Sequence, residues 1–428
     1  MIDSSVTIQN DASGSTMILD FSVRNFGPFR DRITISMNAT ALRDDADTVF
    51  DCKQVKGGLL TSALVFGANA SGKSYLIKAI SALRFMLARP YSGGEEYAAY
   101  QPFRLSDKTV EAPVELRVRV LIDGILYDYS ISYGKSTILN ESLYHYPKGR
   151  RSRVFIRTGP EAFEYGDAAM IARTNSGSSY VVVASSFNDR ICDVFRKEIL
   201  SGIVILDGSL ESIVQRSCDY TSMNDVVKGY AMRALKTADM GISDYHSVER
   251  EIPVSAIDGM PQSMLAMSSG KIRVKDISLK HDLSVEGVGE ENTVFPIDIE
   301  SSGTKAMFGL MGPLVDVLLN GRVLVIDEFG SNLHPLISRW IVGQFSNGPN
   351  PNHAQLIVNT HDIGLMDTDS LVRRDQVWFA NKDRVSGASD LYSLSDFKDV
   401  RKVKSIGKAY LAGRFDAVPV IRARDVIE

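Results

Sequence analysis

The chain has 428 residues, of which 44% are hydrophobic and 23% are charged, a composition typical of globular proteins with two or three core-bearing units. The net charge of −4 excludes a globally basic chain, so any nucleic-acid contact needs a local patch. No apolar run approaches the roughly 18 residues of a membrane span, and the three widely spaced cysteines form neither a disulfide framework nor a zinc site. We therefore expect a cytoplasmic protein without a membrane segment.

The N-terminal part of the sequence predicts strands around one Gly-rich loop. A polar, flexible tail precedes two strands within 17–37. Residues 59–87 have the pattern of a buried strand, a Gly-rich turn and an amphipathic helix. Alternating apolar residues over 113–134 predict a hairpin with an Asp-Gly turn at 123–124, and the segments SLYHYP and SRVFIR continue this antiparallel sheet.

The remainder predicts helices first and then alternating strands and helices. Helical spacing covers 186–250, with the clearest helix over 223–239, and strand patterns return over 271–300. The elements that follow are a helix over 303–319, a strand over 322–326, a helix over 335–345 and a strand over 355–359.

These elements predict an α/β chain whose two ends join in one mixed sheet with a parallel core, flanked by helices. An antiparallel β lobe and a helical insertion lie beside that sheet in this interpretation. The expected segments are a tail, an N-terminal lobe, a helical insertion lobe, a C-terminal lobe and a C-terminal segment, at 1–16, 17–180, 181–270, 271–370 and 371–428.

The segment GANASGKS at 67–74 fits the pattern G-x-x-x-x-G-K-[ST], between a predicted strand and a predicted helix. Its glycines allow backbone N–H groups to turn toward phosphate oxygens, and the start of the helix adds partial positive charge. The lysine of this pattern reaches the β- and γ-phosphates, and the final serine is a ligand of Mg²⁺. A chance Gly-rich turn is the alternative. The expected nucleotide contacts are Gly67, Asn69, Ser71, Gly72, Lys73 and Ser74.

Two further strands end in polar residues. The segment VLVIDE is a buried strand that delivers two carboxylates to its carboxyl end, where an α/β sheet binds its ligand. We expect Asp327 to hold Mg²⁺ through its water shell and Glu328 to orient and deprotonate the attacking water. The strand in AQLIVNTHD ends near His361, which can hydrogen-bond a γ-phosphate and sense hydrolysis. An ordinary capping acid pair and a structural histidine are the alternatives.

Together these motifs resemble those of the ABC-type ATPases, the superfamily that includes chromosome-maintenance and RecF-like repair proteins. GANASGKS is similar to the Walker A loop, VLVIDE to Walker B, GSNLHP to the D-loop, NTHD to the switch histidine and ESSGTK to the signature. The resemblance implies a P-loop NTPase fold of the ABC-ATPase type, with ATP and Mg²⁺ as cofactors. It also implies that Gln101, in YQPFRLSD, contacts Mg²⁺ as the Q-loop glutamine; an ordinary loop residue is the alternative.

The signature motif carries the expectation of a dimer. In ABC-type ATPases the signature helix points at the γ-phosphate bound by the other subunit. The resemblance therefore implies that Ser302 and Gly303 complete the site of a second copy, in a head-to-tail homodimer with ATP sandwiched or in a higher oligomer. Without the resemblance, Ser301 or Ser302 is simply the N-cap of a helix. The motif lacks the double glycine of transporter versions.

A narrower likeness runs through nearly the whole chain, because the same motifs are followed by RRDQVWFANKD, LYSLSDF and AYLAGRFDAVP. This order is similar to that of bacterial ATP-binding proteins of the abortive-infection and phage-defence class, related to the ATPase part of OLD-family proteins. It implies a sensor, switch or scaffold that controls a separate effector from a neighbouring gene, such as a toprim-type nuclease. Asp416 stands where such tails usually carry a small residue.

Other functions stay open from the sequence. A RecF- or SMC-like ATPase that clamps DNA during repair fits the same motifs, although no heptad run predicts long coiled-coil arms. A nuclease within the same chain has little room after the last motif. The basic run KGRRSRVFIR at 148–157 is either a nucleic-acid contact or a solvated hairpin tip.

Overall fold

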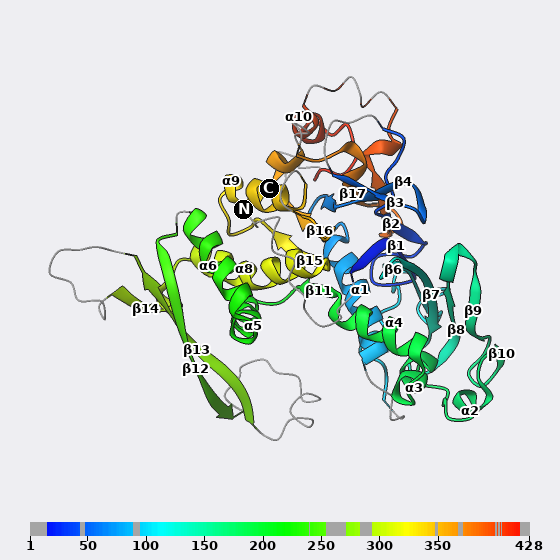
Figure 1. Ribbon diagram of the computed structural model, residues 1–428. Coiled ribbons are helices and arrows are strands. Elements are labelled where there is room, and N and C mark those ends of the chain that lie inside the picture. Colours follow the sequence, from blue (N-terminus) through cyan, green and yellow to red (C-terminus); the bar gives the residue numbers. More distant parts are fainter. Residues whose placement is uncertain are drawn as a thin grey trace. The chain divides into compact units, whose positions relative to one another are not determined.

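The computed structural model (Figure 1) places the chain in two compact units. The first unit contains Met1–Asp207, Val317–Ser331 and Ser338–Glu428, and the second contains Gly208–Asp316 and Asn332–Ile337. The five-segment division expected from the sequence stays a prediction. The residues that the structure describes are 15–42, 48–88, 95–238, 240–253, 271–282, 293–346, 350–366, 371–398, 400, 403 and 405–419.

Seven antiparallel strands form the larger sheet of the first unit, in the order β10-β9-β8-β7-β6-β1-β2. The predicted hairpin at 123–124 is confirmed: Asp123 and Gly124 both have positive φ, at 50° and 72°, as a two-residue hairpin turn requires. The strands are β1 (Thr16–Arg24), β2 (Ile33–Ser36), β6 (Val114–Ile122), β7 (Ile125–Tyr133), β8 (Ile138–His145), β9 (Ser152–Arg157) and β10 (Phe163–Tyr165).

Six strands form the second sheet of this unit, in the order β11-β15-β16-β5-β17-β18, all parallel except the last pair. The two ends of the chain therefore do join in one sheet, which confirms the expected α/β fold with a parallel core and an antiparallel lobe. The strands are β5 (Ser62–Phe66), β11 (Ile203–Leu206), β15 (Val323–Phe329), β16 (Gln355–Thr360), β17 (Val377–Lys382) and β18 (Ser389–Ser393).

A helix and a buried side-chain amide both connect the two sheets. Helix α1 (Lys73–Ala88) contacts β1 of one sheet and β15 of the other. The fully buried Gln355 accepts a hydrogen bond from the Ile18 amide at 2.7 Å and donates to the carbonyl oxygens of Ile18 and Leu60. Because these bonds satisfy the whole side-chain amide in the core, they fix β16 against β1.

Short elements complete the first unit. They are the two-stranded sheet of β3 (Val49–Cys52) and β4 (Val55–Leu60) and the helices α2 (Ala168–Ile171), α3 (Tyr180–Ser186), α4 (Arg190–Ser201) and α10 (Ile406–Leu411). Helix α9 (Pro335–Phe345) has the predicted bounds. No helix in the described ranges is long and apolar enough to cross a membrane.

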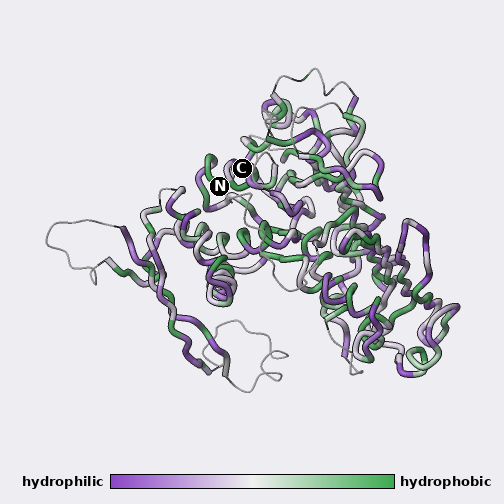
Figure 2. The backbone as a smooth tube through the Cα atoms, in the orientation of Figure 1, coloured by the Kyte–Doolittle hydropathy of each residue, from purple (hydrophilic) through white to green (hydrophobic). Residues whose placement is uncertain are grey.

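The second unit combines helices with a long hairpin. Its helices are α5 (Leu210–Met223), α6 (Asp225–Thr237) and most of α8 (Ser302–Asn320), and its three-stranded sheet contains β12 (Ile242–Pro253), β13 (Lys271–His281) and β14 (Val294–Pro296). Hydrophilic residues recur along both strands of the β12–β13 hairpin (Figure 2).

The helical run predicted over 186–250 is wrong in two places. Residues 203–206 form β11, a short buried strand whose four apolar residues carry no periodicity of their own. Residues 242–253 form β12, which is held by eleven register pairs with β13 rather than by local preference. In both places the pairing with another strand, rather than the local pattern of residues, decides the structure.

Helix α8 contains Pro313, which cannot donate a backbone hydrogen bond. Just before this proline, the buried Ser217 hydroxyl of α5 bridges two backbone groups of α8 that lie one turn apart. It donates to the Phe308 carbonyl at 2.6 Å and accepts from the Gly312 amide at 3.1 Å. These two hydrogen bonds therefore hold α8 against α5 within the second unit.

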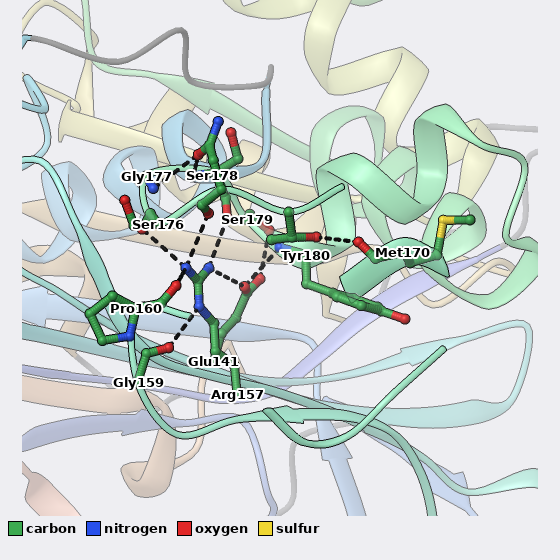
Figure 3. Close-up of polar contacts among 12 residues, drawn as sticks. Glu141, Arg157, Gly159, Pro160, Met170, Ser176, Gly177, Ser178, Ser179 and Tyr180 are labelled. Carbon is green, nitrogen blue, oxygen red and sulfur yellow. Dashed lines mark hydrogen bonds and ion pairs between the residues drawn. The ribbon is translucent and has the colours of Figure 1, made fainter. Parts of the chain in front are cut away.

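The cations of the basic run at 148–157 differ in burial. Arg157 is neither a nucleic-acid contact nor part of a solvated hairpin tip, so both interpretations of the run are wrong for this residue. Its side chain is buried at 1% exposure and points into a ring of backbone carbonyl groups beside Glu141 (Figure 3). Its guanidinium donates to the carbonyl oxygens of Gly159, Pro160, Asn175, Ser176 and Ser178 and lies 3.9 Å from the Glu141 carboxylate. The other four cations of the run are exposed.

Glu141 is the second centre of this cluster. Its carboxylate accepts hydrogen bonds from the Tyr129 hydroxyl, the Ser179 hydroxyl and the Tyr180 amide at 2.8, 2.6 and 2.9 Å. Burial raises the pKa of Glu141 and lowers the pKa of Arg157, and each charge opposes the shift of the other. Removal of either charge therefore leaves the other buried and uncompensated.

We predict that Arg157→Ala lowers the free energy of unfolding by about 3–5 kcal/mol, the usual cost of breaking a buried ion pair. Urea denaturation followed by circular dichroism measures this change. Arg153→Ala is the matched control, because Arg153 is exposed on the same strand, and its effect should stay within about 0.5 kcal/mol. Equal effects of the two variants would contradict a structural role for the buried pair.

Candidate nucleotide-binding site

The Gly-rich loop lies between β5 and α1 in the first unit, as the sequence predicts. Both of its glycines have positive φ, 153° at Gly67 and 106° at Gly72. A Cβ at Gly67 would lie 2.3 Å from the Ala380 carbonyl oxygen of β17, and one at Gly72 would lie 3.1 Å from the Ser389 hydroxyl of β18. The loop therefore needs glycine for its conformation and for its close packing against the β17–β18 hairpin.

Lys73 points back into this loop. Its ammonium group is buried and donates to the Gly67 and Ala68 carbonyl oxygens, both at 2.8 Å. Burial lowers the pKa of Lys73 to about 8, while the nearby carboxylates of Asp327 and Glu328 favour its charged form. The loop thus concentrates one cation and several backbone N–H groups at the start of α1, the arrangement that binds phosphate.

The two carboxylates predicted on β15 lie at a break in the strand pairing. The β15–β16 register shifts between Ile326 and Phe329, which places Asp327 and Glu328 in a bulge. Glu328 has φ of 52°, a left-handed conformation that is uncommon for a residue with a side chain. Bulges of this kind redirect side chains beside functional sites.

Asn359 of β16 holds the bulge in place. Its side-chain oxygen accepts from the Glu328 amide at 2.5 Å, and its side-chain nitrogen donates to the Asp327 carboxylate. The Glu328 amide also lies 3.1 Å from the same carboxylate. The side-chain amide of Asn359 therefore hydrogen-bonds both the backbone N–H of the strained Glu328 and the carboxylate of Asp327. The sequence pattern alone predicts no role for Asn359, because its contacts depend on pairing with a distant strand.

Ser74 and Asp327 come together although 253 positions separate them. The Ser74 hydroxyl donates to the Asp327 carboxylate at 3.0 Å. An Mg²⁺ ion takes one or two such oxygen ligands and keeps several waters, so this pair fits the ion that the sequence predicts. No cluster of three His, Cys, Asp or Glu side chains with metal-binding geometry occurs in the described ranges. The Ser74–Asp327 pair, which has one hydroxyl and one carboxylate, differs from such a cluster.

His361 follows the last residue of β16, on the same edge of the sheet. Partial burial lowers its pKa, the charge of Lys73 lowers it further, and the carboxylate of Glu328 opposes both effects. The imidazole is therefore neutral at pH 7, which leaves one ring nitrogen as a donor and the other as an acceptor. The structure thus brings His361 within the electrostatic reach of the phosphate loop and the acid pair.

A family model supplies the comparison with known proteins. The family described as "AAA domain, putative AbiEii toxin, Type IV TA system" matches residues 62–187 and 235–367, more than half of the chain. The chain belongs to this family. Its resemblance to ATPases of the abortive-infection class is confirmed. A search of curated protein sequences gives no match.

Solved structures similar to this chain include SMC head domains and a RecF protein. An SMC head bound to the C-winged helix domain of ScpA is 14% identical, covering 90% of this chain and 99% of that one, with a TM-score of 0.46. The SMC head from Thermotoga maritima is 14% identical, covering 88% and 98%, with a TM-score of 0.40. RecF with ATP is 14% identical, covering 89% and 100%, with a TM-score of 0.38. Likenesses this distant carry no statement about function.

The predicted Q-loop glutamine of this AAA protein is positioned through its backbone. The Gln101 carbonyl accepts from the Gly27 amide at 2.6 Å, and the Gly27 backbone packs directly on the Tyr75 ring, next to Ser74. The Gln101 side chain donates to the Ala98 carbonyl at 3.4 Å rather than to the Ser74–Asp327 pair. Its contact with Mg²⁺ stays a prediction.

The predicted signature residues Ser302 and Gly303 begin α8 in the second unit of the AAA protein. The N-cap is Ser301, whose hydroxyl accepts from the Thr304 amide at 3.1 Å. Ser302 is exposed. The helix therefore starts with a satisfied cap and an accessible first turn, and the role of this turn toward a second copy stays a prediction.

The other predicted loop residues differ in accessibility. Asn69 is exposed at the tip of the phosphate loop. Ser71 is 2% exposed, and its hydroxyl has no hydrogen-bond partner among the residues that the structure describes. Ser389 of β18, which packs on Gly72, is likewise buried and without such a partner. Two hydroxyl groups with unused hydrogen-bonding capacity thus flank the loop.

We predict that the affinity of this AAA protein for ATP falls as the pH rises above about 8. Phosphate binding requires protonated Lys73, whose pKa is lowered to about 8, and a bound triphosphate raises that pKa again. Binding is therefore fully favourable below pH 8 and weakens by roughly tenfold per pH unit above it. Titration of a fluorescent ATP analogue from pH 6.5 to 9.5 measures the effect.

Lys73→Arg is the control for this pH profile, because arginine stays charged throughout the range. Its affinity, whatever its absolute value, should not vary with pH above 8. A flat profile for the unmodified protein would contradict the assignment of the titrating group.

We predict that Asn359→Ala slows ATP hydrolysis by about 10- to 100-fold, the usual effect of losing a group that orients a metal ligand. ATP affinity should change much less, because Lys73 and the loop backbone are untouched. Steady-state phosphate release and ATP titration separate the two effects. Asn352→Ala is the control, since Asn352 bonds only helix-end carbonyls in the described structure. An unchanged rate in Asn359→Ala would exclude an orienting role.

Proposed function

We propose that this protein binds and hydrolyses ATP with Mg²⁺, and that two copies close head-to-tail around two ATP molecules. In this proposal the closed dimer is a cytoplasmic switch or scaffold in bacterial anti-phage defence. It controls a separate effector protein, such as a toprim-type nuclease from a neighbouring gene.

One observation carries the nucleotide part of the proposal. A phosphate loop, a hydroxyl–carboxylate pair, a second carboxylate and a neutral histidine converge on one edge of a parallel sheet, contributed by β5, β15 and β16. Each is a part that phosphoryl-transfer sites use. An accidental cluster would have no reason to contain all of them together with a strained, hydrogen-bonded acid bulge.

The roles of the side chains follow from their chemistry. Lys73 holds the β- and γ-phosphates once its ammonium leaves the Gly67 and Ala68 carbonyl oxygens. Ser74 and Asp327 would hold Mg²⁺, which supplies charge neutralisation between the phosphates when bound. Glu328, exposed at the bulge, accepts the proton of the attacking water. His361, neutral at pH 7, hydrogen-bonds the γ-phosphate.

The dimer part of the proposal is supported by the start of α8. The first turn of α8, where Ser302 is exposed and Gly303 is half-buried, offers a helix N-terminus, which attracts anions. The phosphate loop of the same chain already has its own helix N-terminus at α1. A second N-terminus of this kind, in a signature-like motif, is best used on the phosphate of another copy.

The defence part of the proposal is supported by the family, whose description refers to a toxin of a type IV toxin–antitoxin system. The tail motifs LYSLSDF and AYLAGRFDAVP are similar to those of defence ATPases. These observations favour a switch for an effector over a DNA clamp.

We predict that Glu328→Gln binds ATP, hydrolyses it at least 100-fold more slowly and accumulates as a dimer, because loss of a catalytic base blocks the step that reopens the sandwich. Light scattering with and without Mg-ATP measures the mass. Lys73→Ala is the control, and it should neither bind nucleotide nor dimerise. Co-purification of Glu328→Gln with the neighbouring gene product then tests the effector.

Two outcomes would count against this proposal. If Glu328→Gln binds ATP but stays monomeric, the head-to-tail sandwich is wrong. If DNA stimulates hydrolysis and Arg150→Glu with Arg151→Glu abolishes the stimulation, a RecF- or SMC-like clamp replaces the defence switch.

A further inference from the structure

A hollow of about 610 Å³ opens beside the phosphate loop in the first unit. It is lined by Asn69 and Ser71 of that loop, by Leu105, by the β17–β18 turn at 381–387 and by Val418. Its volume is in the range of small-molecule sites. The hollow contains none of the catalytic groups described above, so those groups do not explain it.

The strand order places the hollow on the side of β5 away from the acid pair. Strands β16 and β15, with Asp327 and Glu328, lie on one side of β5, and β17 pairs with it on the other. The hollow lies at the carboxyl end of β17, next to the loop that leaves β5. A row of phosphates that began at Asp327 and followed the loop would extend toward this side.

The walls of the hollow have two apolar side chains that are unusually exposed. Val385, at the tip of the β17–β18 turn, is 97% exposed, and Leu105 is 66% exposed. Leu105 packs on the turn itself, where a Cβ at Gly387 would lie 2.4 Å from its Cδ1. Large apolar groups gain free energy when a flat apolar ligand covers them.

The hollow also has one buried hydroxyl without a hydrogen-bond partner in the described ranges. The Ser71 hydroxyl is buried and has no partner among the described residues, a state that is unfavourable unless a ligand or water satisfies it. Lys382 and Arg384 add two cations at the turn. The carboxylate between them, Asp383, is already held by the amide and hydroxyl of Ser386 at 2.7 and 2.6 Å.

We propose that this hollow receives the nucleoside part of the nucleotide, which rests on the proposed function as an ATPase. The base packs against Val385 and Leu105, the Ser71 hydroxyl bonds the sugar or the adjoining phosphate, and the cations at 382 and 384 face the polar edge of the ligand. The C-terminal hairpin thus recognises the nucleoside, while the phosphate loop binds the phosphates.

The test compares ATP with inorganic triphosphate, which has the phosphates but no nucleoside. Calorimetric titration with Mg²⁺ should show that the unmodified protein binds ATP more tightly. Val385→Asp should weaken ATP binding by about tenfold and leave triphosphate binding unchanged. Leu105→Asp should do the same. Leu411→Asp is the control, since Leu411 is 61% exposed on α10 and does not line the hollow.

The outcomes separate this inference from the proposed function. Triphosphate binding by the variants shows that they are folded. If the unmodified protein binds neither ligand, the ATPase proposal fails. If it binds ATP and triphosphate equally, or if Val385→Asp leaves ATP affinity unchanged, the nucleoside site is wrong while the ATPase proposal stands. Val385→Asp can also be combined with Glu328→Gln. If the combined variant keeps its ATP affinity but no longer forms the dimer, the nucleoside site is wrong and the hollow is a contact between copies.

Discussion

The parallel pairing of β5, β16 and β15 is the constraint on which the candidate site depends. Leu64 pairs with Val358, and Val358 pairs with Ile326, so the three strands reach the same edge at the same level. The phosphate loop, Asn359 and the acid pair follow from this register without further adjustment. A shift of one residue in β16 would turn Asn359 to the opposite face and leave the bulge without its support. The buried Gln355, which ties β16 to β1, opposes such a shift.

Strain at the acid pair is the cost of this arrangement. A left-handed Glu328 is disfavoured by about 1–3 kcal/mol, and Asn359 offsets part of that cost by bonding both the amide and Asp327. The carboxylates in turn favour the charged form of buried Lys73. The backbone of the bulge, the Asn359 side-chain amide and the Lys73 ammonium therefore stabilise one another. Glu328 is held in a conformation that a regular strand would not give it.

Local signals account for what the sequence predicts well. The phosphate loop, the hairpin turn at 123–124 and helix α9 depend on residues within a few positions, so pattern and turn chemistry determine them. Arg157, Asn359 and strand β11 depend on partners more than 15 positions away. The sequence pattern predicts a solvated Arg157, because it does not show that the loop at 175–178 surrounds this side chain. The sequence pattern likewise does not show that Asn359 lies beside the bulge at Asp327 and Glu328.

The loop region balances satisfied and unsatisfied groups in a way that suits reversible binding. Lys73 already bonds two loop carbonyls, so in the proposed function it would exchange these hydrogen bonds for phosphate contacts and gain only the difference. The hydroxyls of Ser71 and Ser389 have no described partner to give up, so any bond that they make on binding is a full gain. Ser389 belongs to β18 and packs on Gly72, and Ser71 lines the hollow beside the β17–β18 turn. In the proposed ATP site, this surplus would lie with the C-terminal hairpin, on the side of β5 away from Asp327 and Glu328.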